Sequence, residues 1–267
     1  MKRVFLFLFL IFGFLFASDE SVTVKAKKVG EYVIVNADNK NPFSVTIIYN
    51  ASLENLKSNQ KLPVVFVMHA HSSQEILHLH VDKNPFKLKA NYKWTIGSKD
   101  AQHNSNYLYR LPYKLGTKQS ITQGFNGLFS HYGTSQYAVD FNMKEGSEVY
   151  AARDGKVVDI KYDSNVSGPT REFEKNANFI IMEHSDETLA TYAHLEQNGV
   201  IVKVGEQVKR GQLIGYSGKT GFVNGAHLHF IVYKAVDGIT RASFPIKFIS
   251  QEGIISQPIV GQSYIAE

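Results

Sequence analysis

The stretch GAHLHF, residues 225–230, sets two histidines two positions apart in an apolar segment. Successive side chains of a β-strand point to opposite faces, so a strand here places Leu228 and Phe230 on one face and His227 and His229 on the other. Both imidazoles then lie near enough to one another to serve a single metal site. The stretch therefore predicts a strand with one core face and one reactive face.

A similar pair occurs in EILHLH, residues 75–80, where leucines alternate with His78 and His80. The alternation predicts that these two histidines lie on the solvent side of a half-buried strand. Other side chains nearby in the sequence that can bind a metal are His69, His71 and Asp82. A second metal site is the alternative interpretation, although nothing else in this part of the chain indicates activation of water.

Residues 19–113 consist of short alternating stretches separated by turn-forming residues. The stretches are EYVIVNA, FSVTIIYN, LPVVFVMHAH, EILHLHV and FKLKANYKWTIG. Because none of them holds a helical period, we expect a small N-terminal β-sandwich. The aperiodic segment LPYKLGTKQS, residues 111–120, predicts a domain boundary at 113/114.

Residues 114–250 are also rich in β-strand patterns but contain more glycine. The segments at 146–162 and 200–218 share a pattern of a Val-rich strand, a Gly turn and a second strand. This pattern predicts two stacked hairpins of one antiparallel sheet system, with NFIIMEH and TLATYAHL as a further strand pair between them. Residues 251–267 are expected to be a C-terminal tail.

The N-terminal end and the composition indicate an exported protein. Residues 1–18, MKRVFLFLFLIFGFLFAS, have a basic start, a short apolar run and small residues, which is typical of a signal peptide. The apolar run is shorter than the roughly 20 residues of a membrane span, so we expect no stable membrane insertion after cleavage. The chain has no cysteine, which restricts any metal site to His, Asp or Glu.

The charge of the chain does not favour nucleic-acid binding. The net charge of +5 includes Lys2 and Arg3, and removing these two leaves a scattered excess of +3. Nucleic-acid-binding proteins usually have a concentrated basic stripe, and none is visible in this sequence. A mild positive balance suits an anionic polymer outside the cytoplasm.

Groups able to bind a metal and to activate water gather in the second half of the chain. They are His131 and Asp140 in FSHYGTSQYAVDF, His194 in TYAHL, and His227 and His229 in AHLHF. Two histidines and one aspartate suit zinc and leave a fourth position for water. Each motif alone has an ordinary structural explanation, but all of them occur together in one expected domain.

These motifs, with VYAARDGKVV and VKVGEQVKRGQLIGYSGKTG, resemble the lysostaphin/LytM-like zinc metallopeptidases, which cut peptide bonds of bacterial peptidoglycan. The resemblance covers about residues 120–240. It implies a LytM-like peptidase domain in which His131, Asp140 and His229 bind one Zn²⁺ per chain. It also implies that His194 and His227 are catalytic residues that activate water or stabilise the intermediate.

The sequence departs from the family pattern at two places. The family commonly has three residues between the first histidine and the aspartate, and this chain has eight between His131 and Asp140, as in a subgroup with a longer loop. Ile231 stands where the family often has glutamate. Asn178 matches a position that can line the substrate groove, with a turn or strand-edge role as the alternative.

The resemblance implies a peptidoglycan endopeptidase of the periplasm or cell envelope whose partners are peptidoglycan stem peptides. The bond we expect it to cut joins D-Ala to meso-diaminopimelate. Basic loop residues are expected to attract the stem carboxylates; they are Lys203, Lys209, Arg210 and Lys219. One alternative is a catalytically inactive LytM-like regulator that activates cell-wall amidases, and another is a metal-buffering protein.

Overall fold

The computed structural model describes residues 21–267. The expected signal peptide, residues 1–18, lies outside these described residues. Strands joined by turns account for most of the structure, and the short 3-10 helices are η1 (Gly133–Ser135) and η2 (Arg171–Asn176). No helix within residues 21–267 has the length and apolar character that crossing a membrane requires. The prediction of a mainly β protein is confirmed.

The described chain divides into two compact units. Unit 1 comprises the described residues up to Ile96 together with Asp237–Ile239, and unit 2 comprises Gly97–Val236 and Thr240–Glu267. The boundary expected at 113/114 falls inside unit 2, because β8 (Leu108–Arg110) pairs with β21 (Lys247–Ser250). The segment between 97 and 113 is therefore part of the second unit.

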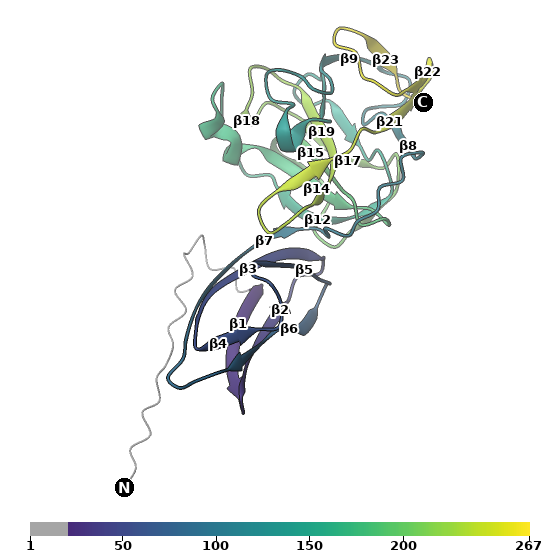
Figure 1. Cartoon of the computed structure of the whole chain (residues 1–267). Helices are drawn as coiled ribbons and strands as arrows, with labels where there is room; N and C mark the ends of the chain where they lie inside the picture. Colours follow the sequence, from purple (N-terminus) through teal and green to yellow (C-terminus); the bar gives the residue numbers. More distant parts are fainter. Residues whose placement is uncertain (1–20) are drawn as a thin grey trace. The chain divides into compact units, whose positions relative to one another are not determined.

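Unit 1 contains two antiparallel sheets (Figure 1). One has the order β1 (Val22–Val29), β2 (Tyr32–Asn39), β6 (Ser72–Val81), β4 (Leu56–Ser58), and the other the order β5 (Val64–Met68), β3 (Val45–Glu54), β7 (Lys87–Ile96). Val24 and Val35 of the first sheet line a small cavity together with Tyr49 of the second. The apolar faces of the two sheets therefore pack on each other, as expected for a small β-sandwich.

The histidines of EILHLH lie on the outer face of this sandwich. Leu77 and Leu79 are buried in β6, whereas the side chains of His78 and His80 are 45% and 44% exposed. His78 pairs with a glutamate three residues earlier at 2.9 Å, and His80 pairs with Asp82 at 3.1 Å. Strand alternation therefore places these two side chains as the sequence predicts.

Unit 2 is built on an eleven-stranded, largely antiparallel sheet. Its main path runs β16 (Gln207–Val208), β12 (Gly155–Lys161), β14 (Asn178–Glu183), β15 (Leu189–Val200), β19 (Leu228–Ala235), β10 (Val139–Phe141), β9 (Lys118–Gln123), β23 (Ser263–Ile265). Off this path, β17 (Leu213–Ser217) pairs with β11 (Glu148–Tyr150) and β15, and β20 (Arg241–Ser243) pairs with β19. Antiparallel pairing brings TYAHL, AHLHF and YAVDF onto three adjacent strands.

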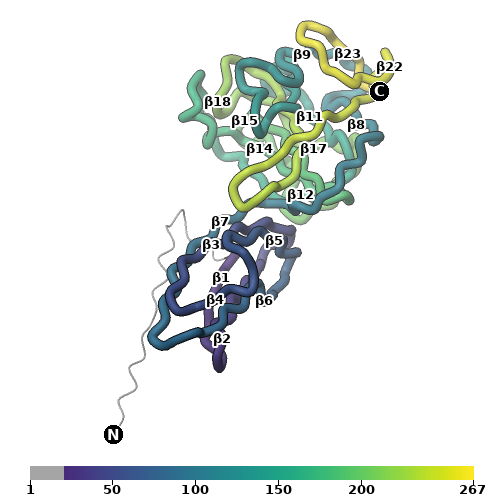
Figure 2. Tube along the Cα trace, in the orientation of Figure 1, coloured from purple at the N-terminus to yellow at the C-terminus, as the bar shows by residue number. Residues whose placement is uncertain are grey.

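Segments distant in the sequence complete this unit. Strand β22 (Gly253–Ile255) pairs with β21. Strand β23, close to the C-terminus, pairs with β9, which lies near the start of unit 2 in the sequence (Figure 2). The expected tail at 251–267 is thus hydrogen-bonded into the sheets. A two-stranded parallel pair joins β13 (Ser167–Gly168) to β18 (Gly221–Phe222).

An aromatic core underlies the main sheet. Tyr192 and Phe230, cross-strand partners on β15 and β19, have ring centroids 4.9 Å apart, and Phe141 and Phe248 lie 5.6 Å apart. All four side chains are essentially inaccessible to solvent. Each buried aromatic ring removes a large apolar area from water, so this core fixes the strands that carry the polar groups on the opposite face.

Candidate metal centre

A row of cross-strand neighbours runs across four strands on one face of the main sheet. Gln123 of β9 lies opposite Asp140 of β10, and Asp140 lies opposite His229 of β19. His229 in turn lies opposite Ala193 of β15. Directly opposed residues of an antiparallel pair share a face, so these side chains are neighbours on the face away from the aromatic core.

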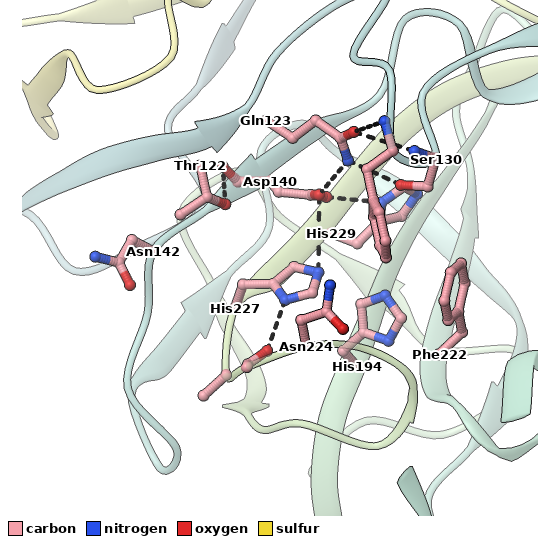
Figure 3. A pocket seen from close by; sticks show the side chains of 13 residues that line it. Thr122, Gln123, Ser130, Asp140, Asn142, His194, Phe222, Asn224, His227 and His229 are labelled. Atoms are coloured by element: carbon pink, nitrogen blue, oxygen red, sulfur yellow. Dashed lines mark hydrogen bonds and ion pairs between the residues drawn. The ribbon is translucent and has the colours of Figure 1, made fainter. Parts of the chain in front are cut away.

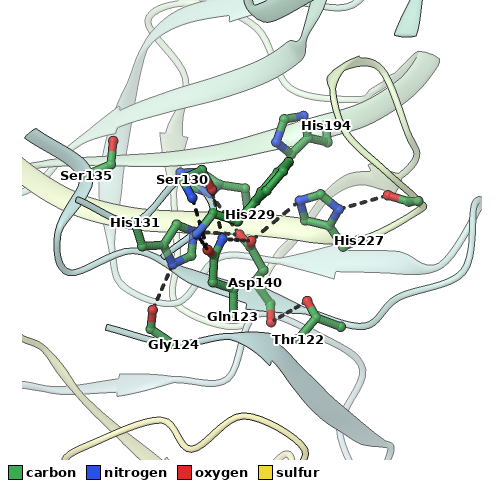
Figure 4. Close-up of polar contacts among 12 residues, drawn as sticks. Thr122, Gln123, Gly124, Ser130, His131, Ser135, Asp140, His194, His227 and His229 are labelled. Carbon is green, nitrogen blue, oxygen red and sulfur yellow. Dashed lines mark hydrogen bonds and ion pairs between the residues drawn. The ribbon is translucent and has the colours of Figure 1, made fainter. Parts of the chain in front are cut away.

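Three expected ligand residues meet at this row, two from its strands and one from a loop. One ligand atom each from His131, Asp140 and His229 lies within 4.8 Å of the other two. Asp140 Oδ1 is 2.9 Å from His229 Nδ1 and 3.1 Å from His131 Nε2 (Figure 4). The longer sequence spacing between His131 and Asp140 therefore does not separate them in space. Within residues 21–267, this is the one group of three or more such side chains with the spacing of a metal site.

The charge state of the group suits a cation. Burial by itself raises the pKa of the Asp140 carboxyl, but hydrogen bonds with His131 and His229 outweigh burial and hold that pKa well below its usual range. Burial lowers the pKa of His229, against the opposing effect of Asp140. A carboxylate beside a neutral imidazole is the protonation state that metal binding requires.

The loop that carries His131 is held by hydrogen bonds with Gln123 and Gly124, at the end of β9. The Nδ1 of the buried His131 donates to the Gly124 carbonyl at 2.9 Å, which directs Nε2 toward Asp140. Gln123 Nε2 donates to Asp140 Oδ2 at 2.9 Å, and its Oε1 accepts from the backbone N–H of Ser130 at 3.1 Å. One amide thus orients the carboxylate and fixes the histidine loop, the kind of outer support that ordered metal ligands need.

A β-bulge brings His194 to the same face. Phe179 of β14 pairs with Ala193 and the preceding Asn178 pairs with Leu195, which leaves His194 as the extra residue. Its φ of 66° is in the left-handed region, which a residue with a Cβ adopts at a cost. The bulge interrupts the alternation, so both Ala193 and His194 face the site before Leu195 returns to the core.

A buried polar network holds the bulge. His194 Nδ1 donates to the Thr220 carbonyl at 2.8 Å, and the Thr220 hydroxyl donates to the Leu195 carbonyl at 2.7 Å while accepting from the Asn178 N–H at 2.9 Å. The Asn178 side chain is buried and donates to the carbonyls of Ser164, Leu195 and Glu196. Asn178 therefore supports the bulge from behind and does not line the groove.

His194 and His227 lie side by side next to the ligand group (Figure 3). Their ring centroids are 4.6 Å apart, and His194 is 5.8 Å from the ring of His229. Burial, followed by the nearby His227 and His229, lowers the pKa of His194 to about 3. His194 is therefore neutral at physiological pH, and because Nδ1 donates to a carbonyl, its Nε2 carries the free lone pair.

Asp140, His194, His227 and His229 line a groove of about 410 Å³. Phe129 and Phe222 also line it, with ring centroids 5.1 Å apart, and Thr122, Asn142 and Asn224 add polar groups. Next to Phe129 the side chain of Leu128 is 97% exposed. The groove thus combines a polar floor with an apolar wall, which suits an extended peptide.

The sequence alone did not single out Gln123 or Thr220 as part of the site. Gln123 stands in strand β9, where its position opposite Asp140 depends on a pairing between distant segments. Thr220 follows the turn residues of GYSGKTG, and only the fold brings its carbonyl to His194. The four expected basic loop residues are absent from the groove lining within the described chain, and Lys209 and Lys219 pair with Asp154 and Glu145.

The part of the chain that carries most of these residues matches a known protein family. Residues 134–240 match the model of Peptidase family M23, a segment that includes Asp140, His194, His227 and His229. This part of the chain is a Peptidase family M23 domain, which confirms the resemblance expected from the motifs. His131 lies a few residues before the matched segment.

Two curated relatives and one solved structure illustrate the similarity. The chain is 34% identical over 122 residues to peptidoglycan DD-endopeptidase ShyA of Vibrio cholerae, covering 44% of this chain and 26% of ShyA. It is 33% identical over 155 residues to glycyl-glycine endopeptidase ALE-1 of Staphylococcus capitis, covering 57% of this chain and 38% of ALE-1. The lysostaphin catalytic domain of Staphylococcus simulans is 27% identical, with 53% of this chain and 95% of that domain covered and a TM-score of 0.34. The chain spans well under half the length of these two curated relatives.

Proposed function

We propose that the protein is a zinc-dependent peptidoglycan endopeptidase that hydrolyses peptide cross-links of the bacterial cell wall. The observation that carries the proposal is the convergence of His131, Asp140 and His229 at a groove that Asp140 and His229 line, with His194 and His227 beside them. Catalytic zinc sites combine three such ligands with an open position and nearby groups that transfer protons.

The donor set of this chain fits zinc. Two imidazole nitrogens and one carboxylate oxygen are borderline and hard ligands, and His131 and Asp140 each have an outer partner that fixes their orientation. A zinc ion bound by these residues would supply polarisation of the scissile carbonyl and a lower pKa for the attacking water. One ion per chain is expected.

The proton-transfer roles belong to the two remaining histidines. His194 is neutral and presents Nε2 as a hydrogen-bond acceptor, so it can take a proton from water in the groove. His227 donates from Nδ1 to the Gly225 carbonyl at 2.9 Å, which leaves Nε2 to face the groove beside Asp140. A protonated His227 at that place would stabilise negative charge on the intermediate.

The apolar wall gives the groove a means to hold substrate. Arg171 packs over the Phe222 ring at 5.7 Å and donates to the Tyr132 hydroxyl at 2.6 Å, which braces the wall from outside. Phe129 and Phe222 can pack against the aliphatic part of a stem peptide, while Asn224 offers an amide to its backbone.

The substrate we propose is the cross-link between D-Ala and meso-diaminopimelate. The printed name of ShyA, a DD-endopeptidase, supports this choice, and ALE-1, named for glycyl-glycine bonds, represents the competing one. The signal-like segment at 1–18 supports export to the periplasm or cell envelope. Stem peptides of peptidoglycan are the proposed partners, and the proposed domains are the signal peptide, a β domain and the peptidase domain.

Digestion of purified peptidoglycan with the protein, followed by mass spectrometry of the products, tests this function. The expected result is conversion of cross-linked dimers to monomers that end in D-Ala. Cutting that is restricted to glycine bridges would contradict the substrate. An inactive regulator would release nothing by itself and would increase product release when a cell-wall amidase is added.

A further inference from the structure

A second, positively charged cavity lies in unit 2, with a volume of about 490 Å³. Its lining residues are Arg110, Lys114, Leu115, Tyr150, Arg210 and Gly211. It shares no lining residue with the histidine groove. In Figure 1, β8, which carries Arg110, and β18, which lines the groove, lie on different sides of the unit. The cavity is therefore a separate feature of the fold.

Arg110 forms the floor of this cavity and is only 8% exposed. Its guanidinium lies over the Tyr150 ring at 5.1 Å, and one of its N–H groups donates to the Tyr113 carbonyl at 3.2 Å. Gly211, with φ of 80°, passes so close that a Cβ there would be 3.1 Å from Arg110 Nη1. The guanidinium is thus held in one orientation with most of its five N–H groups available.

The charges around Arg110 are not balanced by acids. Among residues 21–267, no carboxylate lies within 4.0 Å of the guanidinium of Arg110 or of Arg210. Glu148 is engaged by Lys114 at 3.1 Å, and Asp154 is engaged by Lys209 and by the Arg210 backbone N–H. Burial, and then the charge of Arg210, lowers the pKa of Arg110. A buried cation without a counter-ion is costly.

We propose that this cavity is a binding site for an oxyanion, a phosphate or a carboxylate, held between Arg110 and Arg210. The planar fork of a guanidinium matches two oxygens of either group, and two such forks give a stronger and more specific contact than a lysine. The open mouth of the cavity admits a group that is part of a larger molecule. This site does not depend on the proposed peptidase activity.

The test is a titration of the zinc-loaded protein with inorganic phosphate and, separately, with acetate, read from the arginine side-chain N–H signals in NMR spectra. The expected result is a saturable shift of the Arg110 and Arg210 signals at constant ionic strength. Arg210→Gln should weaken binding by roughly tenfold or more, because it removes a charge-assisted contact. Arg110→Lys keeps the charge and should weaken binding similarly through loss of the fork.

Lys209→Ala is the matched control, since it removes a neighbouring positive charge that pairs with Asp154 outside the cavity. It should bind phosphate or acetate as the unmodified protein does. If only phosphate saturates the site, the natural ligand carries a phosphate group. If only acetate saturates it, the natural ligand carries a carboxylate. Either result supports the site. Shifts that chloride reproduces, or equal weakening in Lys209→Ala and Arg210→Gln, would overturn it. Because the histidine groove is unchanged, peptidoglycan cleavage by these variants reports separately on the proposed function.

Discussion

Asp140 and His229 lie directly opposite each other on β10 and β19, and 2.9 Å separates Asp140 Oδ1 from His229 Nδ1. The same oxygen is 3.1 Å from His131 Nε2. The carboxylate therefore organises both histidines, one on a strand and one in a loop. Its second oxygen accepts from Gln123, so the position of Asp140 is fixed from both sides.

Replacing either strand ligand should remove zinc and activity together. Asp140→Ala or His229→Ala leaves two ligands, which is fewer than a catalytic zinc site uses. We expect near-zero zinc per chain by elemental analysis and no release of muropeptide monomers. The double variant His78→Gln, His80→Gln is the control, because these side chains lie on the outer face of unit 1 and should leave both measurements unchanged. Full zinc content in Asp140→Ala would show that the ligand set is wrong.

His194 and His227 should behave differently from the ligands. His194→Ala and His227→Ala should retain zinc and lose about 10²- to 10⁴-fold in kcat/KM, the usual contribution of a general acid or base. Elemental analysis beside steady-state kinetics on a cross-linked muropeptide separates the two effects. If these variants lost zinc as fully as His229→Ala, the division of roles would fail.

The network behind His194 should matter for both stability and rate. Thr220→Val removes the hydroxyl between the Asn178 N–H and the Leu195 carbonyl and leaves both buried groups without this partner. We expect the free energy of unfolding to fall by about 2 kcal/mol and kcat to fall with zinc retained. Urea denaturation and kinetics measure these changes, and Thr220→Ser should restore most of both. A Thr220→Ser variant as impaired as Thr220→Val would argue that packing, not the hydroxyl, supports His194.

Strand periodicity explains how much of the site could be predicted from the sequence. Alternation predicts that His229 and Asp140 each point away from the apolar side of their own strand, and the structure has them as direct partners. The same rule places His78 and His80 outward. These residues depend only on a local period of two, which the sequence displays.

The bulge at His194 could not be predicted in this way. Strict alternation along β15 would put His194 on the face shared by Ala190 and Tyr192, which is the core face. An extra residue in the pairing with β14 reverses the direction of the side chain. Bulges depend on the partner strand, and a single strand's pattern does not reveal them.

The strand partners also could not be predicted from local patterns. The segments 146–162 and 200–218 were expected to form separate hairpins, but β11 pairs with β17 and β12 pairs with β16, each across the two segments. The strand β1 (Val22–Val29) was not singled out either. Non-local pairing is decided by which apolar faces meet in the core, and this information is spread over the whole chain.

A buried histidine away from the site should make stability depend on pH. Burial lowers the pKa of His184 to about 4 from the ordinary 6.5, and its Nδ1 donates to the Asp154 carbonyl at 2.8 Å. The folded-state pKa is below the unfolded-state value, so the unfolded chain takes up the proton first as pH falls. Stability is therefore full above about pH 6.5 and is lost down to about pH 4.

Between these two pH values, the titration of His184 changes the free energy of unfolding by about 3 kcal/mol. Urea denaturation at several pH values, for the unmodified protein and for His184→Gln, isolates it from other titrating groups. The glutamine variant should lose less stability between neutral and acidic pH. Parallel pH profiles for the two proteins would contradict the assignment.

The central claim is that the group formed by His131, Asp140 and His229 binds the zinc on which cleavage depends. The most direct measurement is the conversion of a purified D-Ala to meso-diaminopimelate cross-linked dimer to monomers, followed by chromatography before and after chelation. We predict that an excess of chelator stops conversion, that one equivalent of Zn²⁺ per chain restores it, and that Asp140→Ala is not restored by zinc. Monomer release that continues in excess chelator after the protein's zinc has been removed would contradict this account.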